Sequence, residues 1–304
     1  MSTLRILVTG SSGLIGSNLV PFLNAGGHRP IRLVRSQSQV PVLGERWSWD
    51  PERGTMLSAG SEGLDAVVHL AGENIAGARW TQRKKARIRD SRVKGTRLLC
   101  NLLARHSSPP KALVCASAVG YYGDRGDEIL KEESTPGSGF LADVCQEWEA
   151  ATQPAAETGI RVVNLRIGIV LSPLGGALAK MLTPFKLGAG GLIGSGRQYM
   201  SWIALDDVVG AICFALTNES LYGSVNAVAP IAVTNRDFTQ TLGRVLSRPT
   251  LLPMPAFAAR LALGEMADAL LLASTRVEPA RLLASGFKFR YPDLEGALRH
   301  VLRD

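Results

Sequence analysis

The sequence lacks the short motifs by which several common enzyme classes are recognised. It has no G-x-S-x-G nucleophile elbow, no G-x-x-x-x-G-K-[ST] phosphate loop and no H-E-x-x-H zinc helix. Its four histidines are far apart and give no metal-ligand spacing. These absences disfavour elbow-type serine hydrolases, P-loop nucleotidases and zinc peptidases.

Cysteine is also scarce, and long apolar runs are missing. The four cysteines lie in separate apolar segments with no C-x-x-C pair: Cys100, Cys115, Cys145 and Cys213. We expect reduced, buried thiols rather than a disulfide framework or a zinc site. No apolar run is long enough to cross a bilayer, and the short run near the N-terminus lacks signal-peptide anatomy. We therefore expect a cytoplasmic protein with no membrane partner.

The net charge of +8 comes from one segment. Nine basic residues and one acid lie between Arg79 and Arg97, whereas the rest of the chain has 25 charges of each sign. This excess lies on a single predicted helix, without interleaved aromatic residues or a base-reading motif, so a nucleic-acid partner is disfavoured. Most of these charges are expected to form a solvated helix face.

A strand, a glycine turn and a helix are present at the start of the chain. A short apolar run over residues 4–9 is typical of a buried parallel strand, and apolar residues at helical spacing begin at residue 14. Between them stands the sequence GSSGLIG. Glycines in this context allow a tight turn, backbone approach to a pyrophosphate and close helix packing, with the helix N-terminus facing the anion. The predicted cofactor residues here are Gly10, Ser12, Gly13, Leu14, Ile15 and Gly16.

The residue that ends the second predicted strand indicates which dinucleotide binds. In dinucleotide folds an acid at this place binds the adenosine ribose hydroxyls. Residues 30–35 read as that strand, and its last residue is Arg35. A guanidinium pairs with a 2′-phosphate, which a carboxylate would repel. We therefore predict NADP(H) rather than NAD(H), the alternative being that Arg35 is an ordinary surface arginine.

Two further segments are expected to complete the cofactor site. Residues 65–72 form a buried strand that ends in a small-residue turn, where Leu70, Ala71 and Gly72 would let the cofactor lie against backbone. His69 is expected to be a packed strand residue without a catalytic role. A helix capped by Thr81 and running to about residue 105 follows, and we expect its Arg92 to reach a cofactor phosphate.

The next strands bring polar groups to the same edge. A strand over residues 111–116 delivers Ser117, Tyr121 and Tyr122 beyond its carboxyl end, where ligands of open α/β sheets bind. These three are the candidate catalytic residues. A helix over 140–157 and a strand over 160–165 follow, and we add Arg166 and Val170 to the cofactor set.

The alternation of strands and helices over the first 170 residues predicts an α/β fold with a doubly wound parallel sheet of the Rossmann type. We assign residues 1–171 to an NADP(H)-binding domain, to which 205–228 return. Residues 172–304 form a smaller substrate lobe with an extension from about 250. The candidate substrate residues are Glu73, Arg197 and Trp202.

The motifs resemble those of extended short-chain dehydrogenases/reductases, in particular an atypical branch similar to NAD(P)-dependent epimerases and dehydratases. The runs that carry the resemblance are LAGENI at 70–75, SR at 91–92, GSG at 194–196, SWI at 201–203, NAVAP at 226–230 and GFKF at 286–289. The resemblance implies cofactor binding, pairing of family members through two helices, and a C-terminal extension of unknown role. A homodimer is therefore expected.

One part of the family pattern is absent. The family's chemistry uses a tyrosine acid/base with a lysine four positions later, and a serine that orients substrate. No tyrosine here has that lysine; by helix register the two places fall near Phe140-Leu141 and Val144-Cys145. The serine place falls on Ser117 or on Ala118, depending on the alignment.

We therefore predict an NADP(H)-dependent oxidoreductase or epimerase-like protein that acts on an unidentified small molecule, with a nucleotide-sugar-like compound as the candidate. In such a protein Tyr121 or Tyr122 would replace the missing acid, and Glu73 is a second candidate. The alternative is an NADP(H)-binding sensor or scaffold without catalysis.

Overall fold

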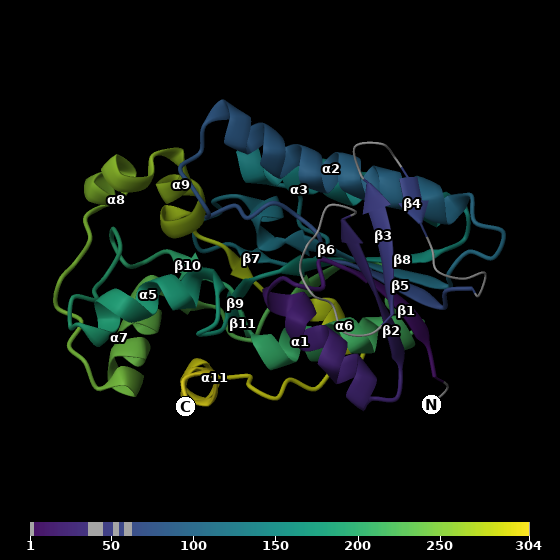
Figure 1. Cartoon of the computed structure of the whole chain (residues 1–304). Helices are drawn as coiled ribbons and strands as arrows, with labels where there is room; N and C mark the ends of the chain where they lie inside the picture. The colour runs from purple at the N-terminus through teal and green to yellow at the C-terminus, as the bar shows by residue number, and fades with distance from the viewer. Residues whose placement is uncertain (1–2, 36–44, 51–54, 58–62, 304) are drawn as a thin grey trace.

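A twisted eight-stranded sheet forms the centre of the computed structural model, which describes residues 3–35, 45–50, 55–57 and 63–303 (Figure 1). Its strands are β1 (Arg5–Thr9), β2 (Arg29–Arg35), β3 (Arg46–Asp50), β4 (Thr55–Leu57), β5 (Ala66–His69), β6 (Ala112–Ala118), β8 (Arg161–Ile167) and β12 (Gly223–Ala227). Their order is β12-β8-β6-β5-β1-β2-β3-β4, and every pair is parallel except β3 with β4. The predicted doubly wound parallel sheet is confirmed.

Helices cover both faces of the sheet. They are α1 (Leu14–Ala25), α2 (Gln82–Ala104), α3 (Phe140–Ala150), α4 (Gln153–Glu157) and α6 (Leu205–Thr217). Figure 1 shows α2 and α3 over one face and α1 and α6 over the other. Between the layers the central strands are almost completely buried; for example, Ile6, Leu7, Val67 and Leu113 have no exposed surface. This apolar enclosure on both faces explains why these strands read as continuous apolar runs in the sequence.

A second, smaller group of elements follows β8. It contains β9 (Ile169–Leu171), α5 (Gly176–Lys186), β10 (Tyr199–Met200), β11 (Trp202–Ala204), β13 (Val233–Thr234) and α7 (Asn235–Leu246). These elements have a hydrophobic core of their own, in which Leu178, Trp202 and Phe238 are buried. Between β11 and β13 the chain returns to the sheet layer through α6 and β12, and β12 pairs in parallel with β8. The second lobe is therefore connected to the sheet in the middle of its sequence as well as at its start.

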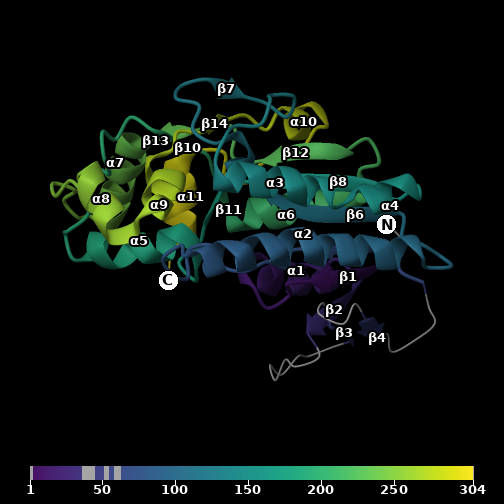
Figure 2. The ribbon, with the colours of Figure 1, turned by 90° about the horizontal axis from the view of Figure 1, so that it is seen from above.

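The C-terminal segment contacts both the second lobe and the β12 edge of the sheet. Its elements are α8 (Ala256–Leu263), α9 (Glu265–Ala267), the π-helical turn η2 (Asp268–Leu272), β14 (Arg276–Val277), α10 (Ala280–Ala284) and α11 (Leu294–Val301). Seen from above in Figure 2, α8 lies at one end of the molecule and α10 lies beside β12, the edge strand of the sheet. β14 pairs with the short strand β7 (Ile129–Leu130), and Lys85 of α2 forms an ion pair with Glu265. The extension therefore fastens the second lobe to the sheet layer.

Two local predictions were wrong. The helix predicted over 140–157 is divided into α3 and α4, with Ala151 and Thr152 between them, because Pro154 starts a new helical turn. Part of the predicted loop 51–63 is the antiparallel edge strand β4. The predicted cap of α2 is confirmed, since Thr81 Oγ1 accepts a hydrogen bond from Lys84 N.

Two helical glycines allow a matched test of the packing around the glycine turn. A Cβ at Gly16 would lie 2.3 Å from the carbonyl oxygen of Gly10, whereas a Cβ at Gly95 in α2 would meet nothing within 4 Å. We expect Gly16→Ala to lower the free energy of unfolding by about 2–3 kcal/mol through overpacking. Gly95→Ala should raise it by about 0.5–1 kcal/mol, because alanine favours the helix. Urea denaturation measures both, and equal effects of the two substitutions would refute this reading of the turn.

Candidate cofactor and active site

The glycine turn brings three backbone segments into close contact. Gly10 has a φ of 64°, and a Cβ there would lie 2.7 Å from the carbonyl oxygen of Leu70. Gly13 N donates to Gly10 O at 3.0 Å and so closes the turn. α1 then begins without a side-chain cap and without an acid in its first turn. Its N–H groups and positive dipole end are therefore suited to an anion supplied from outside.

The turn after β5 lies beside the glycine turn. Leu70 N and Ala71 N both donate to Thr9 Oγ1, at 3.1 and 3.2 Å. A Cβ at Gly72 would lie 3.3 Å from Cζ of Arg92, so the guanidinium packs on this turn. Arg92 Nη1 donates to the carbonyls of Glu73 and Ile88, and burial lowers the pKa of Arg92. Arg92 was predicted to reach a cofactor phosphate. The structure places its guanidinium beside Gly72, and the phosphate contact stays a prediction.

His69 belongs to a buried chain of hydrogen bonds. Thr9 Oγ1 already accepts two N–H groups, so its hydroxyl proton donates to His69 Nδ1 at 2.7 Å. The remaining ring proton is then on Nε2, which donates to Thr96 Oγ1 at 3.0 Å, and Trp148 Nε1 donates to the same oxygen. Burial lowers the pKa of His69 to about 4. The prediction that His69 is a packed strand residue agrees with this arrangement.

Two arginines of β2 lie near the glycine turn. Leu33 is paired with Thr9, so Arg35 lies two residues beyond the end of β1, at the carboxyl edge of the sheet, and it is exposed. Arg32 reaches the same turn, with Nη1 at 3.5 Å from the carbonyl oxygen of Ser11. Its Nε is buried and has no hydrogen-bond partner among the residues that the structure describes. This edge therefore has two guanidinium groups without a carboxylate partner in the described part of the chain.

At the ends of β6 and β8 a buried ion pair organises the candidate catalytic residues. Ser117 is in register with Arg166 across these strands. Arg166 Nε and Nη2 each lie 2.8 Å from one oxygen of Glu149, on α3, so the pair is bidentate. Ser117 Oγ and Ser224 Oγ donate to the same carboxylate, at 2.7 and 2.9 Å. All of the strong acceptors of Glu149 are therefore used inside the protein.

The two adjacent tyrosines have different environments. Tyr122 is fully buried; its hydroxyl accepts from Arg166 Nη1 at 2.9 Å and donates to Asn226 Oδ1 at 2.7 Å. Burial raises the pKa of Tyr122 to about 12. Tyr121 is partly exposed, and its ring lies on the Arg166 guanidinium with Cζ 3.4 Å from the ring centroid. Of the two, only Tyr121 remains available to a small molecule.

Several predicted site residues have other surroundings than expected. Ser117 is 3% exposed and its proton is held by Glu149, which argues against direct orientation of a substrate. Arg166, predicted to bind the cofactor, is equally buried and is held in the ion pair with Glu149. Val170 pairs in β9 with Ile203 and is partly buried against the main core.

The candidate substrate residues do not converge. Lys84 and Arg87 lie 2.6 and 3.0 Å from Glu73 Oε1, and the hydrogen bond from Lys84 is the first cause of its lowered pKa. A carboxyl group held ionised by two cations is poorly suited to be a general acid. Trp202 is 1% exposed in the core of the second lobe, whereas Arg197 is exposed. We therefore retain only Arg197 as a candidate for substrate contact.

Apolar side chains fill the places where the family's tyrosine and lysine were sought. A Cβ at Gly120 would lie 3.3 Å from Leu141 Cβ and 3.9 Å from Cys145 Sγ. Burial raises the pKa of the Cys145 thiol to about 12, so it is no substitute for the lysine. Sequence reasoning also missed Glu149. No sequence motif identifies Glu149. The register that places Ser117 beside Arg166 was the available signal, because a buried arginine at that position requires an acidic partner.

The comparisons with known proteins agree along the chain. A model of the NAD dependent epimerase/dehydratase family matches residues 6–227, and one of a domain of unknown function, DUF1731, matches 254–301. The chain is 44% identical over 301 residues to epimerase family protein Mb2239 of Mycobacterium bovis, covering 99% of this chain and 98% of the relative.

Solved structures give the same result. A crystal structure of human epimerase family protein SDR39U1 with NADPH matches with a TM-score of 0.89 at 36% identity, covering 98% of this chain and 99% of that one. The nucleoside-diphosphate sugar epimerase from Corynebacterium glutamicum matches with a TM-score of 0.80 at 40% identity, covering 99% of this chain and 58% of that one.

The His69 hydrogen-bond chain predicts a pH dependence of stability. The folded state binds a proton at His69 less tightly than the unfolded state, because its pKa falls from 6.5 to about 4. Stability is therefore lost as the pH falls below 6.5, by about 2 kcal/mol between pH 7 and pH 5. Glutamine does not titrate, so the free energy of unfolding of His69→Gln should fall by about 2 kcal/mol less than that of the unmodified protein between pH 7 and pH 5. Thermal unfolding at each pH measures the difference, and parallel curves for both proteins would contradict the assignment.

Proposed function

Because the chain belongs to the NAD-dependent epimerase/dehydratase family, we propose that it binds NADP(H) across the carboxyl edge of the sheet and acts as an oxidoreductase or epimerase-like enzyme on a small molecule. The observation that carries the proposal is the start of α1, which has no side-chain cap and no acid in its first turn. It follows a turn in which a Cβ atom at Gly10 or Gly16 would clash with the backbone. The NADPH in the crystal structure of the human relative supports it.

Different residues of this edge would bind different parts of the cofactor. The turn from Gly10 to Gly16, with Ser12, Leu14 and Ile15 at the start of α1, would hold the pyrophosphate through backbone N–H groups. Arg35 would pair with the 2′-phosphate, since it is exposed at the end of β2. Leu70, Ala71 and Gly72 would lie against the ribose, with Arg92 behind them.

The proposed chemistry is a hydride exchange with the nicotinamide, accompanied by a proton transfer at Tyr121. Tyr121 would hold or release the proton through its phenol oxygen. Arg166 is the positioning residue, because its guanidinium lies under the Tyr121 ring and is itself fixed by Glu149. Tyr122 is a structural partner in this proposal, because its hydroxyl is occupied by Arg166 and Asn226.

A non-catalytic NADP(H) sensor or scaffold is the second candidate. Leu141 and Cys145 beside Gly120 favour it, since they fill the region expected to hold the family's tyrosine and lysine. The substrate class of the enzyme is proposed only by likeness: the structural relative from Corynebacterium glutamicum is named for nucleoside-diphosphate sugars.

We further propose a cytoplasmic protein that pairs through α2 and α3, the two helices that the family resemblance implies for a homodimer. Among the described residues, no helix is both long and apolar enough to cross a membrane. Exposed ion pairs such as Arg89 with Glu147 connect these two helices and would lie in the contact.

The role of Arg35 is tested by cofactor preference. Arg35→Ser should weaken NADPH binding by about 10- to 100-fold, because one bidentate charged pair is lost, and should leave NADH binding within a factor of about two. Fluorescence titration with both nucleotides measures this. Arg29→Ser, at the opposite end of the same strand, is the matched control. Equal loss for both nucleotides would contradict the assignment.

The role of Tyr121 is tested by turnover. NADPH oxidation is followed with a panel of small carbonyl compounds. Nucleotide sugars, which carry no free carbonyl group, are tested with NADP⁺ for its reduction or for formation of the epimer. Tyr121→Phe should lower kcat by about 10²- to 10⁴-fold without changing NADPH affinity, because only the proton donor is removed. Tyr122→Phe should instead lower thermal stability, because Asn226 Oδ1 loses the hydroxyl that donates to it and Arg166 Nη1 loses one of its acceptors. NADPH binding without turnover on any substrate of the panel would favour the sensor.

A further inference from the structure

The outer end of the second lobe exposes an unusual number of large apolar side chains. Their exposed fractions lie between 45% and 81%, whereas most side chains of this size are buried; they are Leu187, Leu251, Leu252, Met254, Phe257 and Leu261. We call this surface the apolar tip. Isolated exposed apolar residues are ordinary, but a contiguous group at one end of a molecule marks an interaction site.

The tip is assembled from two segments that are distant in the sequence. Arg248 Nε donates to the carbonyl of Lys186 at 2.9 Å, and Met254 N donates to Leu192 O at 2.7 Å. The stretch from Lys186 to Ile193 therefore lies alongside the stretch from Arg248 to Met254. Figures 1 and 2 both place α8 at the end of the molecule, far from the sheet.

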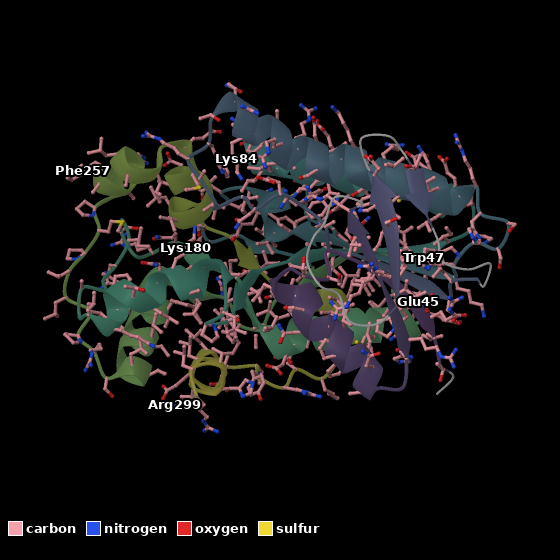
Figure 3. All side chains as sticks on the ribbon, viewed as in Figure 1. Glu45, Trp47, Lys84, Lys180, Phe257 and Arg299 are labelled. Carbon is pink, nitrogen blue, oxygen red and sulfur yellow. The ribbon has the colours of Figure 1, made fainter. Side chains whose placement is uncertain are left out.

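Helix α8 adds an apolar face that points away from the protein. Ala259 is its only buried residue, and Phe257 and Leu261, four positions apart, share the opposite side. Figure 3 shows the labelled Phe257 at the outer boundary of the molecule. An aromatic and a leucine on one exposed helix face are in the arrangement by which helices lie in a lipid interface.

The stretches of chain that form the tip are basic. Residues 184–193 and 244–264 contain four cations and no acid. Arg244 and Arg260 form ion pairs with Glu295 and Asp268, but among the described residues Lys186 and Arg248 have no carboxylate partner. The rim of the tip is therefore positive, which favours an anionic partner. A second copy related by a two-fold axis would bring the same positive charges together.

We propose that the apolar tip docks reversibly on an anionic lipid bilayer. Phe257, Leu261 and the exposed run at 251–255 would enter the interface, while Lys186 and Arg248 contact the headgroups. A protruding apolar loop suits a lipid interface, because lipid needs no complementary shape. The proposal departs from the sequence-based expectation of no membrane partner, which considered spanning segments alone. It does not depend on the proposed enzymatic function.

Sedimentation of the full-length protein with phospholipid vesicles tests the proposal. We expect binding to vesicles of phosphatidylcholine with about one third phosphatidylglycerol, weakened by salt, and little binding to phosphatidylcholine alone. The double substitution Phe257→Ser, Leu261→Ser should lower the affinity at least about tenfold. Lys186→Gln with Arg248→Gln should lower it about tenfold on the anionic vesicles.

A matched control removes two apolar side chains that are exposed elsewhere. Tyr222→Ser with Leu283→Ser, beside β12 and α10, should bind vesicles as the unmodified protein does. Circular dichroism and NADPH binding verify that each variant is folded. No binding to the anionic vesicles, or unchanged binding of the tip variant, would overturn the proposal. Self-association that the tip substitutions abolish, measured by analytical ultracentrifugation, would also overturn it and identify a second copy as the occupant.

Discussion

The close contact between the glycine turn and the turn after β5 is the constraint on which the rest of the site depends. The backbone of Gly10 meets that of Leu70 at a distance that leaves no room for a Cβ, and the same is true of Gly16 over Gly10. This contact directs the start of α1 at the carboxyl edge of the sheet. It also sets the positions of Ala71 and Gly72. The next helix, α2, carries Arg92 and the basic face, so their positions depend on the same contact.

A buried ion pair organises the other half of the edge. Glu149 and Arg166 have side chains that are 11% and 3% exposed, and burying two charges is costly unless their hydrogen bonds are satisfied. Here Ser117, Ser224 and Tyr122 complete the network. Ser117 and Tyr122, two of the three catalytic candidates from the sequence, therefore use their hydroxyl groups as hydrogen-bond partners of this ion pair. The ring of Tyr121 lies on Arg166 at the partly exposed side of this network. Of the two adjacent tyrosines, Tyr121 is therefore the one whose phenol group a small molecule can reach.

The C-terminal extension has both a buried and an exposed part. Its buried part joins the lobes: Asn226 Nδ2 donates to the carbonyl of Glu278, and Asp207 accepts hydrogen bonds from the backbone of Arg290 and Tyr291. Its exposed part carries α8 and most of the apolar tip. One segment of the chain thus both joins the two lobes and exposes most of the apolar tip.

The sequence by itself determined the features that depend on neighbours in the chain. The strand–turn–helix order, the glycines, the arginine at the end of β2, the cap at Thr81 and the parallel sheet class all follow from local spacing, because period and turn chemistry are local properties. Only the tertiary structure decided which polar residues are free. Ser117, Tyr122 and Arg166 look alike to sequence reasoning, but strand register brings them to Glu149, and burial then forces them to pair. The apolar tip was hidden for the same reason, since it joins residues 187 and 251–261, and exposure is a property of the fold that composition does not contain.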